Sequence, residues 1–146
     1  MTGLRTLQRF GAMPPGQRAL LFRAVAIAGF VELGLRTLPL PTLGRCLGIR
    51  VVGRLPVERA RAPAPAAAVA DAVRAVDAIY RRRPRSGRCL RRALVLGALL
   101  GRYGPALRIG VAKVDTEFSA HAWVEISGVV MPDLPADVAS EFVQLR

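Results

Sequence analysis

Aromatic side chains are scarce in this chain of 146 residues, where they make up 5% of the total. They do not interleave with the arginines, as they do on surfaces that stack single-stranded bases. Nucleic acid is therefore disfavoured as a partner, although the formal net charge is +12. Lys113 is the only lysine, so arginine carries almost all of the positive charge. Acidic peptides and acidic proteins rank first as partners for such a surface, and salt should weaken their binding.

Cysteine and histidine are also rare, with Cys46, Cys89 and His121 as the complete set. Two cysteines in a chain of this size do not form a disulfide framework, and we expect them to be reduced in the cytoplasm. One histidine and two distant cysteines give no closely spaced group of three or four zinc ligands. We therefore expect neither a metal nor another cofactor.

The sequence shows neither a secretory signal nor a membrane span. Residues 1–17 contain no apolar core placed directly after their charges, and no small-residue cleavage site follows, so we expect no export. The apolar stretch 19–40 is interrupted by Arg23, Glu32 and Arg36, well short of the ~18 uncharged residues that a span needs. We predict a buried amphipathic helix there, with peripheral contact with a membrane as the alternative.

Proline and glycine divide the N-terminal half into elements. The Pro-Pro-Gly run at 14–16 marks the start of the first helix, and Pro39 with Pro41 marks its end. Residues 43–55 are expected to form a short helix and an extended piece, followed by a linker or helix lead-in at the alanine- and proline-rich run 63–68.

A third helix is predicted from residue 69 to residue 80, because apolar residues recur there every three or four positions. They are Val69, Val73, Val76, Ile79 and Tyr80. The basic run 81–85 then places cations at the helix C-terminus, where the macrodipole favours them. A solvated cap is favoured for this run over a docking patch.

The segment CLRRALVLGALLGRYG, from Cys89 to Gly104, has the same helical spacing and places Cys89 at the start of a helix. The positive end of the helix dipole and the unpaired N–H groups there favour a thiolate, and Arg88, Arg91 and Arg92 should add positive potential. These features predict a nucleophilic cysteine, with a small buried apolar residue as the alternative. Cys46 lacks this context, and we expect it to serve in packing.

Two β-type runs follow, LRIGVAKV at 107–114 and AHAWVEI at 120–126, and they indicate an antiparallel meander with a turn at Ser127 and Gly128. Alternation places His121 on one face with Trp123 and Glu125. The opposite face is more uniformly apolar and carries Ala122, Val124 and Ile126. His121 is thus the only candidate for the base that a catalytic thiol requires.

Such a base needs a third group to orient its ring. Glu125 lies about 13 Å along the strand from His121 and cannot reach it. Asp133 would return to the face of His121 if the hairpin loop had three residues or a bulge, whereas a strict two-residue loop would point it away. Asp115 is a weaker candidate, and a plain turn residue is the alternative reading of Asp133.

The motifs CLRRALVL at 89–96, IGV at 109–111 and AHAWVE at 120–125, with the later Asp133, resemble the B-proteins of lasso-peptide biosynthesis. These are leader peptidases, and the resemblance covers about residues 69–133. The order Cys, His, Asp also resembles the wider transglutaminase-like and papain-like group. The resemblance implies an α+β fold, in which a helical N-terminal layer at 1–62 precedes a cysteine-peptidase core at 63–146 with its catalytic helix on a small antiparallel sheet. We expect one compact unit overall.

By the same resemblance, Cys89 is the nucleophile, His121 the general base and acid, and Asp133 its orienter, and the substrate is a ribosomally made precursor peptide. The chain resembles the split form, which relies on a separate small leader-recognition protein, and the lasso cyclase is a further candidate partner. Ala93 stands where such proteins often have serine. The chain has no asparagine and none of its three glutamines lies near the motifs, so only the backbone N–H of Cys89 is predicted to bind the oxyanion.

Two other classes stay open. One is a transglutaminase-like acyl transferase that uses the same triad and passes the acyl group to an amine. The other is a non-enzymatic adaptor that holds the partners of a peptide-maturation complex together through its basic surface and N-terminal helix. The products formed from a precursor peptide distinguish hydrolysis from transfer, and precursor processing that stays intact in Cys89→Ala would support the adaptor.

Overall fold

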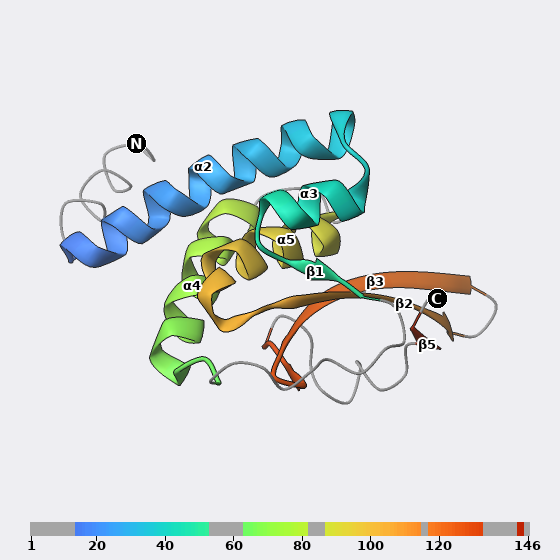
Figure 1. The fold of residues 1–146 in the computed structure, drawn as a ribbon. Helices are drawn as coiled ribbons and strands as arrows, with labels where there is room; N and C mark the ends of the chain where they lie inside the picture. The colour runs from blue at the N-terminus through green and yellow to red at the C-terminus, as the bar shows by residue number, and fades with distance from the viewer. Residues whose placement is uncertain (1–13, 53–62, 82–86, 115–116, 133–142, 145–146) are drawn as a thin grey trace, which may run out of the picture.

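The helices gather on one side of a twisted sheet, as Figure 1 shows. The computed structural model describes residues 14–52, 63–81, 87–114, 117–132 and 143–144. Within these ranges the elements are α2 (Pro15–Thr37), α3 (Leu40–Cys46), β1 (Arg50–Val51), α4 (Ala66–Tyr80), α5 (Arg88–Leu99), the 3₁₀ turn η1 (Gly101–Tyr103), β2 (Ala106–Val114), β3 (Glu117–Ile126), β4 (Val129–Val130) and β5 (Val143–Gln144). The predicted α+β fold class is confirmed.

Proline residues set the bounds of the first two helices. Pro15 opens α2, where the missing N–H costs nothing because the first turn has no intrahelical partner for it. Leu38 is extended and precedes Pro39, which ends α2 as predicted. Pro41 was expected only as a break, but it lies in the first turn of α3. The short helix that was expected from residue 43 therefore begins three residues earlier, at Leu40.

The sheet has the order β1-β2-β3-β4, and β5 also pairs with β2. Its centre is the long antiparallel pair of β2 and β3, which runs from Ala106 opposite Glu125 to Val114 opposite Glu117. β1 pairs with β2 in parallel, so the sheet is mixed rather than purely antiparallel as expected. A two-residue strand has no hydrophobic period of its own, which is why its direction was not predictable.

The hairpin between β3 and β4 has a two-residue loop, because Ile126 pairs directly with Val129. Ser127 and Gly128 both have positive φ, 53° and 80°, as in a type I′ turn. The N–H of Met131 still bonds to the carbonyl of Val124, so the same register continues for one further pair. In the sequence analysis, a strict two-residue loop was expected to point Asp133 away from His121.

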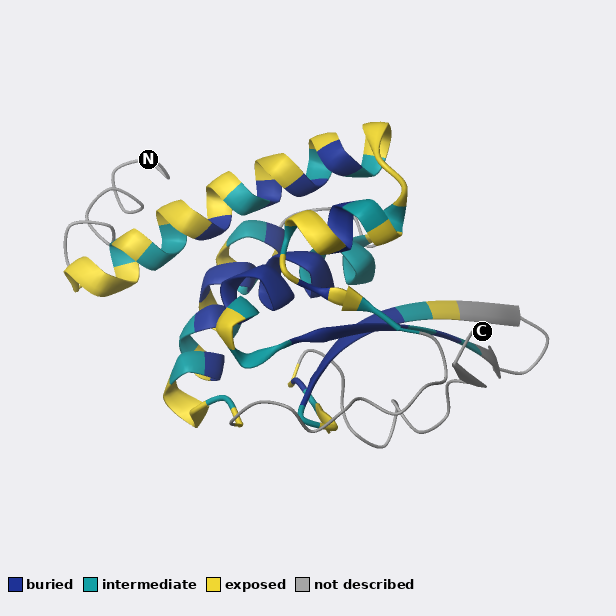
Figure 2. Ribbon diagram, in the orientation of Figure 1, coloured by how far each residue is buried: buried dark blue, intermediate teal, exposed yellow. Residues whose placement is uncertain are grey.

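The core lies between the helices and the upper face of the sheet, and α5 is its central element (Figure 2). Gly97 of α5 has no room for a side chain, because a Cβ there would come within 2.8 Å of Ile49 and 3.6 Å of Val124. Buried side chains of α2, such as Val31, belong to the same core cluster as those of α5 and β3. The division at residue 62 stays a prediction.

Candidate active site

Cys89 is the second residue of α5, so the predicted position at the start of a helix is confirmed. Gly87 is the N-cap and takes the left-handed conformation, with φ of 62°. Glycine has no side chain that could cap the helix, so no capping side chain competes with a substrate oxygen for the N–H groups of the first turn. Cys89 is a free thiol and is partly buried against the core. Its local setting therefore suits a nucleophile beside an oxyanion site.

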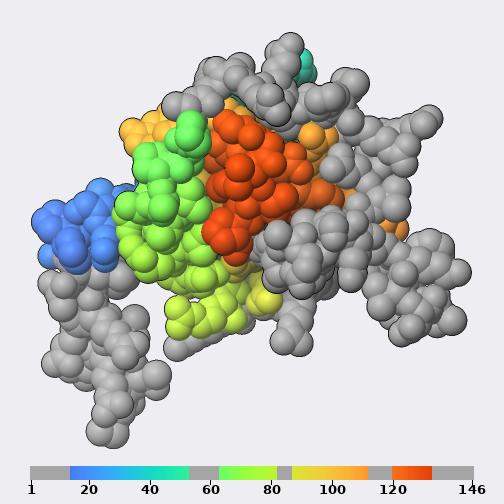
Figure 3. All heavy atoms as spheres, turned by 90° about the horizontal axis from the view of Figure 1, so that it is seen from below, coloured from blue at the N-terminus to red at the C-terminus, as the bar shows by residue number. Residues whose placement is uncertain are grey.

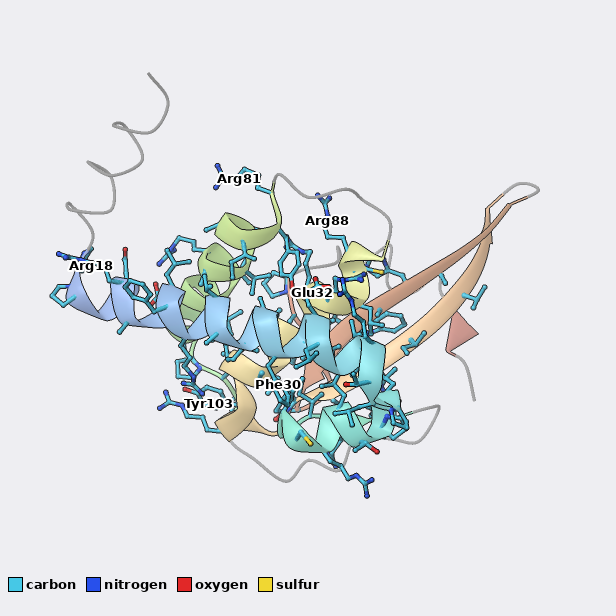
Figure 4. The ribbon with its side chains drawn as sticks, turned by 90° about the horizontal axis from the view of Figure 1, so that it is seen from above. Arg18, Phe30, Glu32, Arg81, Arg88 and Tyr103 are labelled. Carbon is cyan, nitrogen blue, oxygen red and sulfur yellow. The ribbon has the colours of Figure 1, made fainter. Side chains whose placement is uncertain are left out.

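Two arginines of the first turns of α5 tie this helix to its neighbours. Nε of Arg91 donates to the carboxylate of Glu32 on α2 at 2.9 Å, and Figure 4 shows Glu32 between α2 and α5. Nη1 of Arg92 lies 2.7 Å from Oδ1 of Asp77 on α4. These pairs fix the orientation of the first turn. They also offset part of the positive potential that the sequence analysis assigned to Arg91 and Arg92.

His121 lies on β3 directly opposite Gly110 of β2. Its side chain is partly buried, and its Nε2 atom is shielded from solvent. Gly110 places no side chain on that face beside the imidazole, because cross-strand partners share a face of the sheet, and Gly110 is itself buried. The fold therefore holds the ring in a sheltered position on β3.

Glu125 has another role on the same face of β3. Its carboxylate accepts hydrogen bonds from Nε of Arg108 at 3.0 Å and from Nε1 of Trp123 at 3.2 Å. All three side chains are buried. This network agrees with the expectation that Glu125 does not orient His121. It also confirms the predicted alternation, because Trp123 and Glu125 lie on one face and Val124 packs on the other, against α5.

The elements that carry Cys89 and His121 are in contact, since α5 packs on β3. The main contact uses the face of Val124, whereas His121 belongs to the opposite face. Next to His121, however, β3 is an edge strand in the described part of the sheet, because β4 pairs only with Glu125 and Ile126. Seen from above, the first turn of α5 lies on the side of β3 away from β2 (Figure 4). A cysteine on that turn can meet an imidazole only around this edge.

The candidate orienters Asp133 and Asp115 lie outside the described residues. The two-residue loop means that strand register alone does not bring Asp133 to the face of His121. The described pairing of this hairpin ends with the bond from the N–H of Met131 to the carbonyl of Val124, and the described residues of this segment end at Pro132. Its role as orienter stays a prediction.

In the view from below, β3 and β4 occupy the middle of this face beside α4 (Figure 3).

Two further positions differ from expectation. Cys46 was expected to pack, but it is exposed, because α3 buries Leu43 and Gly44 and Cys46 lies on its last turn away from them. Gln144 was thought remote from the motifs. The backbone register of β5 places it opposite Gly110, two strands from His121. A two-residue strand near the end of a chain carries no sequence signal that could have found this proximity.

A family model matches most of the chain. The model of the Transglutaminase-like superfamily matches residues 31–145, a region that contains Cys89 and His121. No curated protein and no solved structure matches the chain. Among the described helices, none has the length and apolar content required to cross a bilayer.

Proposed function

Because the chain belongs to the Transglutaminase-like superfamily, which includes cysteine peptidases and acyltransferases, we propose that it is a cytoplasmic cysteine peptidase that removes the leader of a ribosomally made lasso-peptide precursor. The observation that carries the proposal is the position of Cys89. It lies at the uncapped N-terminus of a helix that packs on the strand of the only histidine, inside the region that matches the family.

In the proposed reaction, His121 takes the proton of Cys89 and the thiolate attacks the scissile carbonyl of the precursor. The backbone N–H of Cys89 stabilises the oxyanion, with the helix dipole behind it. The imidazolium then protonates the leaving amine, and a thioester remains on the sulfur. Water activated by His121 hydrolyses the thioester and frees the thiol. Asp133 orients the ring during both half-reactions.

The proposed partners follow from the same activity. The precursor binds through its leader region, and a separate small leader-recognition protein presents that leader to the site. The lasso cyclase is a further candidate member of the complex. The net charge of +12 favours an acidic leader or an acidic recognition protein, because opposite charges speed their encounter.

The test is incubation of the purified chain with a short precursor peptide encoded near its gene and with the accompanying recognition protein, followed by mass spectrometry. Hydrolysis gives two fragments whose masses sum to that of the precursor plus one water. The acyl-transferase alternative gives an adduct with an added amine, or the loss of ammonia. An adaptor leaves the precursor intact unless another enzyme is supplied.

Variants assign the roles. Cys89→Ala and His121→Ala are expected to lower cleavage at least about 10³-fold, since a triad member contributes on this scale, and Asp133→Asn is expected to lower it less. Cys46→Ala is the matched control, because it removes an exposed thiol and should leave the rate unchanged. Thermal unfolding of each variant separates lost chemistry from lost folding. Full activity of Cys89→Ala would end the proposal.

A further inference from the structure

The outer face of α2 is apolar and exposed to solvent. Alanines and Val31 on the inner face pack in the core. On the outside, large apolar side chains are exposed: Phe22 by 65%, Val25 by 53%, Phe30 by 45% and Leu33 by 61%. Figure 2 shows exposed positions along the whole outer side of this helix.

These side chains form one patch and are not scattered. Phe22 and Leu33 are separated by about three helical turns, so they point in the same direction, and Ala26 and Gly29 lie between them on that line. Among the described residues, the only other strongly exposed large apolar side chains are Leu38, directly after α2, and Val129 on β4. Single exposed apolar residues are ordinary, whereas a continuous apolar patch indicates a binding surface.

The charges around this patch are all positive. Arg18 and Arg36 stand about five turns apart, so they lie on the same side of the helix near the two ends of the patch. Arg23 is exposed beside it. Glu32 is the only carboxylate of α2, and it turns inward to bind Arg91 at 2.9 Å. The outer face therefore combines apolar side chains and cations without an acidic residue.

Figure 1 shows α2 as the outermost layer of the described structure. A flat surface can therefore contact the helix along its length. An apolar strip with arginines beside it matches helices that lie in the interface of a membrane, where apolar groups enter the acyl boundary and cations meet lipid phosphates.

We propose that the outer face of α2 binds the surface of an anionic phospholipid bilayer, with the helix parallel to the membrane plane. The bound state keeps the fold intact, because the inner face of α2 stays on α4 and α5. The proposal is independent of the peptidase chemistry, since it uses no residue of the candidate site.

Flotation of the full-length chain with vesicles tests this proposal. Vesicles of phosphatidylglycerol and phosphatidylcholine should carry the protein upward, whereas vesicles of pure phosphatidylcholine should not. Salt at about 0.5 M shortens the Debye length and should therefore reduce binding to the anionic vesicles. The double variant Phe22→Glu/Leu33→Glu should lose at least about tenfold of the binding, because charge on the apolar strip opposes insertion.

Val129→Glu is the control for a single Glu at an exposed apolar position, because Val129 is 59% exposed and lies away from α2, and this variant should float like the unaltered chain. Circular dichroism checks that every variant is folded. The proposal is overturned if the unaltered chain does not float with anionic vesicles, if the double variant floats equally well, or if light scattering shows a dimer that the double variant dissociates. Cys89→Ala should float normally, so failure of the peptidase proposal would not affect this result.

Discussion

The carboxylate of Glu125 lies between Nε of Arg108 and Nε1 of Trp123 in a buried part of the sheet. A buried ion pair contributes little net stability against an apolar replacement, but removal of one partner leaves the other charge without compensation. Arg108 and Glu125 have side-chain exposures of 6% and 11%, so solvent does not screen them effectively. The sheet therefore depends on both partners of this pair being present.

Glu125→Gln should consequently destabilise the fold by about 3 kcal/mol, because the buried guanidinium of Arg108 would lose the carboxylate that it binds at 3.0 Å. Asp71→Asn is the matched acid-to-amide control. Its ion pair with Arg74 is exposed, so we expect a change below about 0.5 kcal/mol. Urea denaturation measures both variants. Unchanged stability of Glu125→Gln together with lost cleavage would instead identify Glu125 as a residue that positions His121.

At single positions, the sequence predicted the two residues whose signal is local. Cys89 was placed by the helical period that follows it, and His121 by the alternation around it. The exposure of Cys46 was missed, because a seven-residue helix packs on one side only and the sequence does not say which. The relation between Cys89 and His121 depends on how α5 crosses β3, which is a tertiary property that no local pattern contains.

At the scale of elements, the long helices were predictable because proline and glycine mark their ends and apolar residues repeat within them. The β2–β3 pair was predictable from its alternation. β1 is the extended piece expected within 43–55, but its parallel pairing with β2 was not predictable, and neither was β5, since two residues cannot show a period and the pairing depends on distant parts of the chain. The reason for Gly97 was not predictable either. Glycine lowers the stability of a helix, and only the tertiary structure shows the close packing with Ile49 that requires glycine here.

Gly97→Ala should destabilise the fold by about 1–3 kcal/mol, because the new Cβ would meet the buried side chain of Ile49 at 2.8 Å and that side chain would have to move. Gly29→Ala makes the same substitution within α2, where nothing lies within 4 Å, and should stabilise the fold by about 0.5–1 kcal/mol. Chemical denaturation of the two variants gives opposite signs. Equal effects would mean that α5 does not pack as closely as Gly97 indicates.

For the molecule as a whole, α2 has two apolar faces with different tasks. Its inner face joins the core through Ala24, Ala28 and Val31, and its outer face is proposed to meet a membrane. The inner contacts cross the predicted boundary at residue 62, since the same cluster includes side chains of α4, α5 and β3. A shared core makes separate unfolding of 1–62 and 63–146 unfavourable, because either part would expose the apolar surface that the other covers.

The chain should therefore unfold in one step, and Trp123 provides the means to check this. It is the only tryptophan and reports on the sheet, whereas far-ultraviolet circular dichroism reports mainly on the helices. Both signals should change at the same urea concentration. Val31 is buried and lies far from Trp123 in the sequence, so Val31→Ala should open a cavity under α2. This variant should lower the free energy of unfolding by about 2 kcal/mol and move both midpoints equally. If only the helical signal moved, α2 would be a separately folding layer and the core at 63–146 would stand without it.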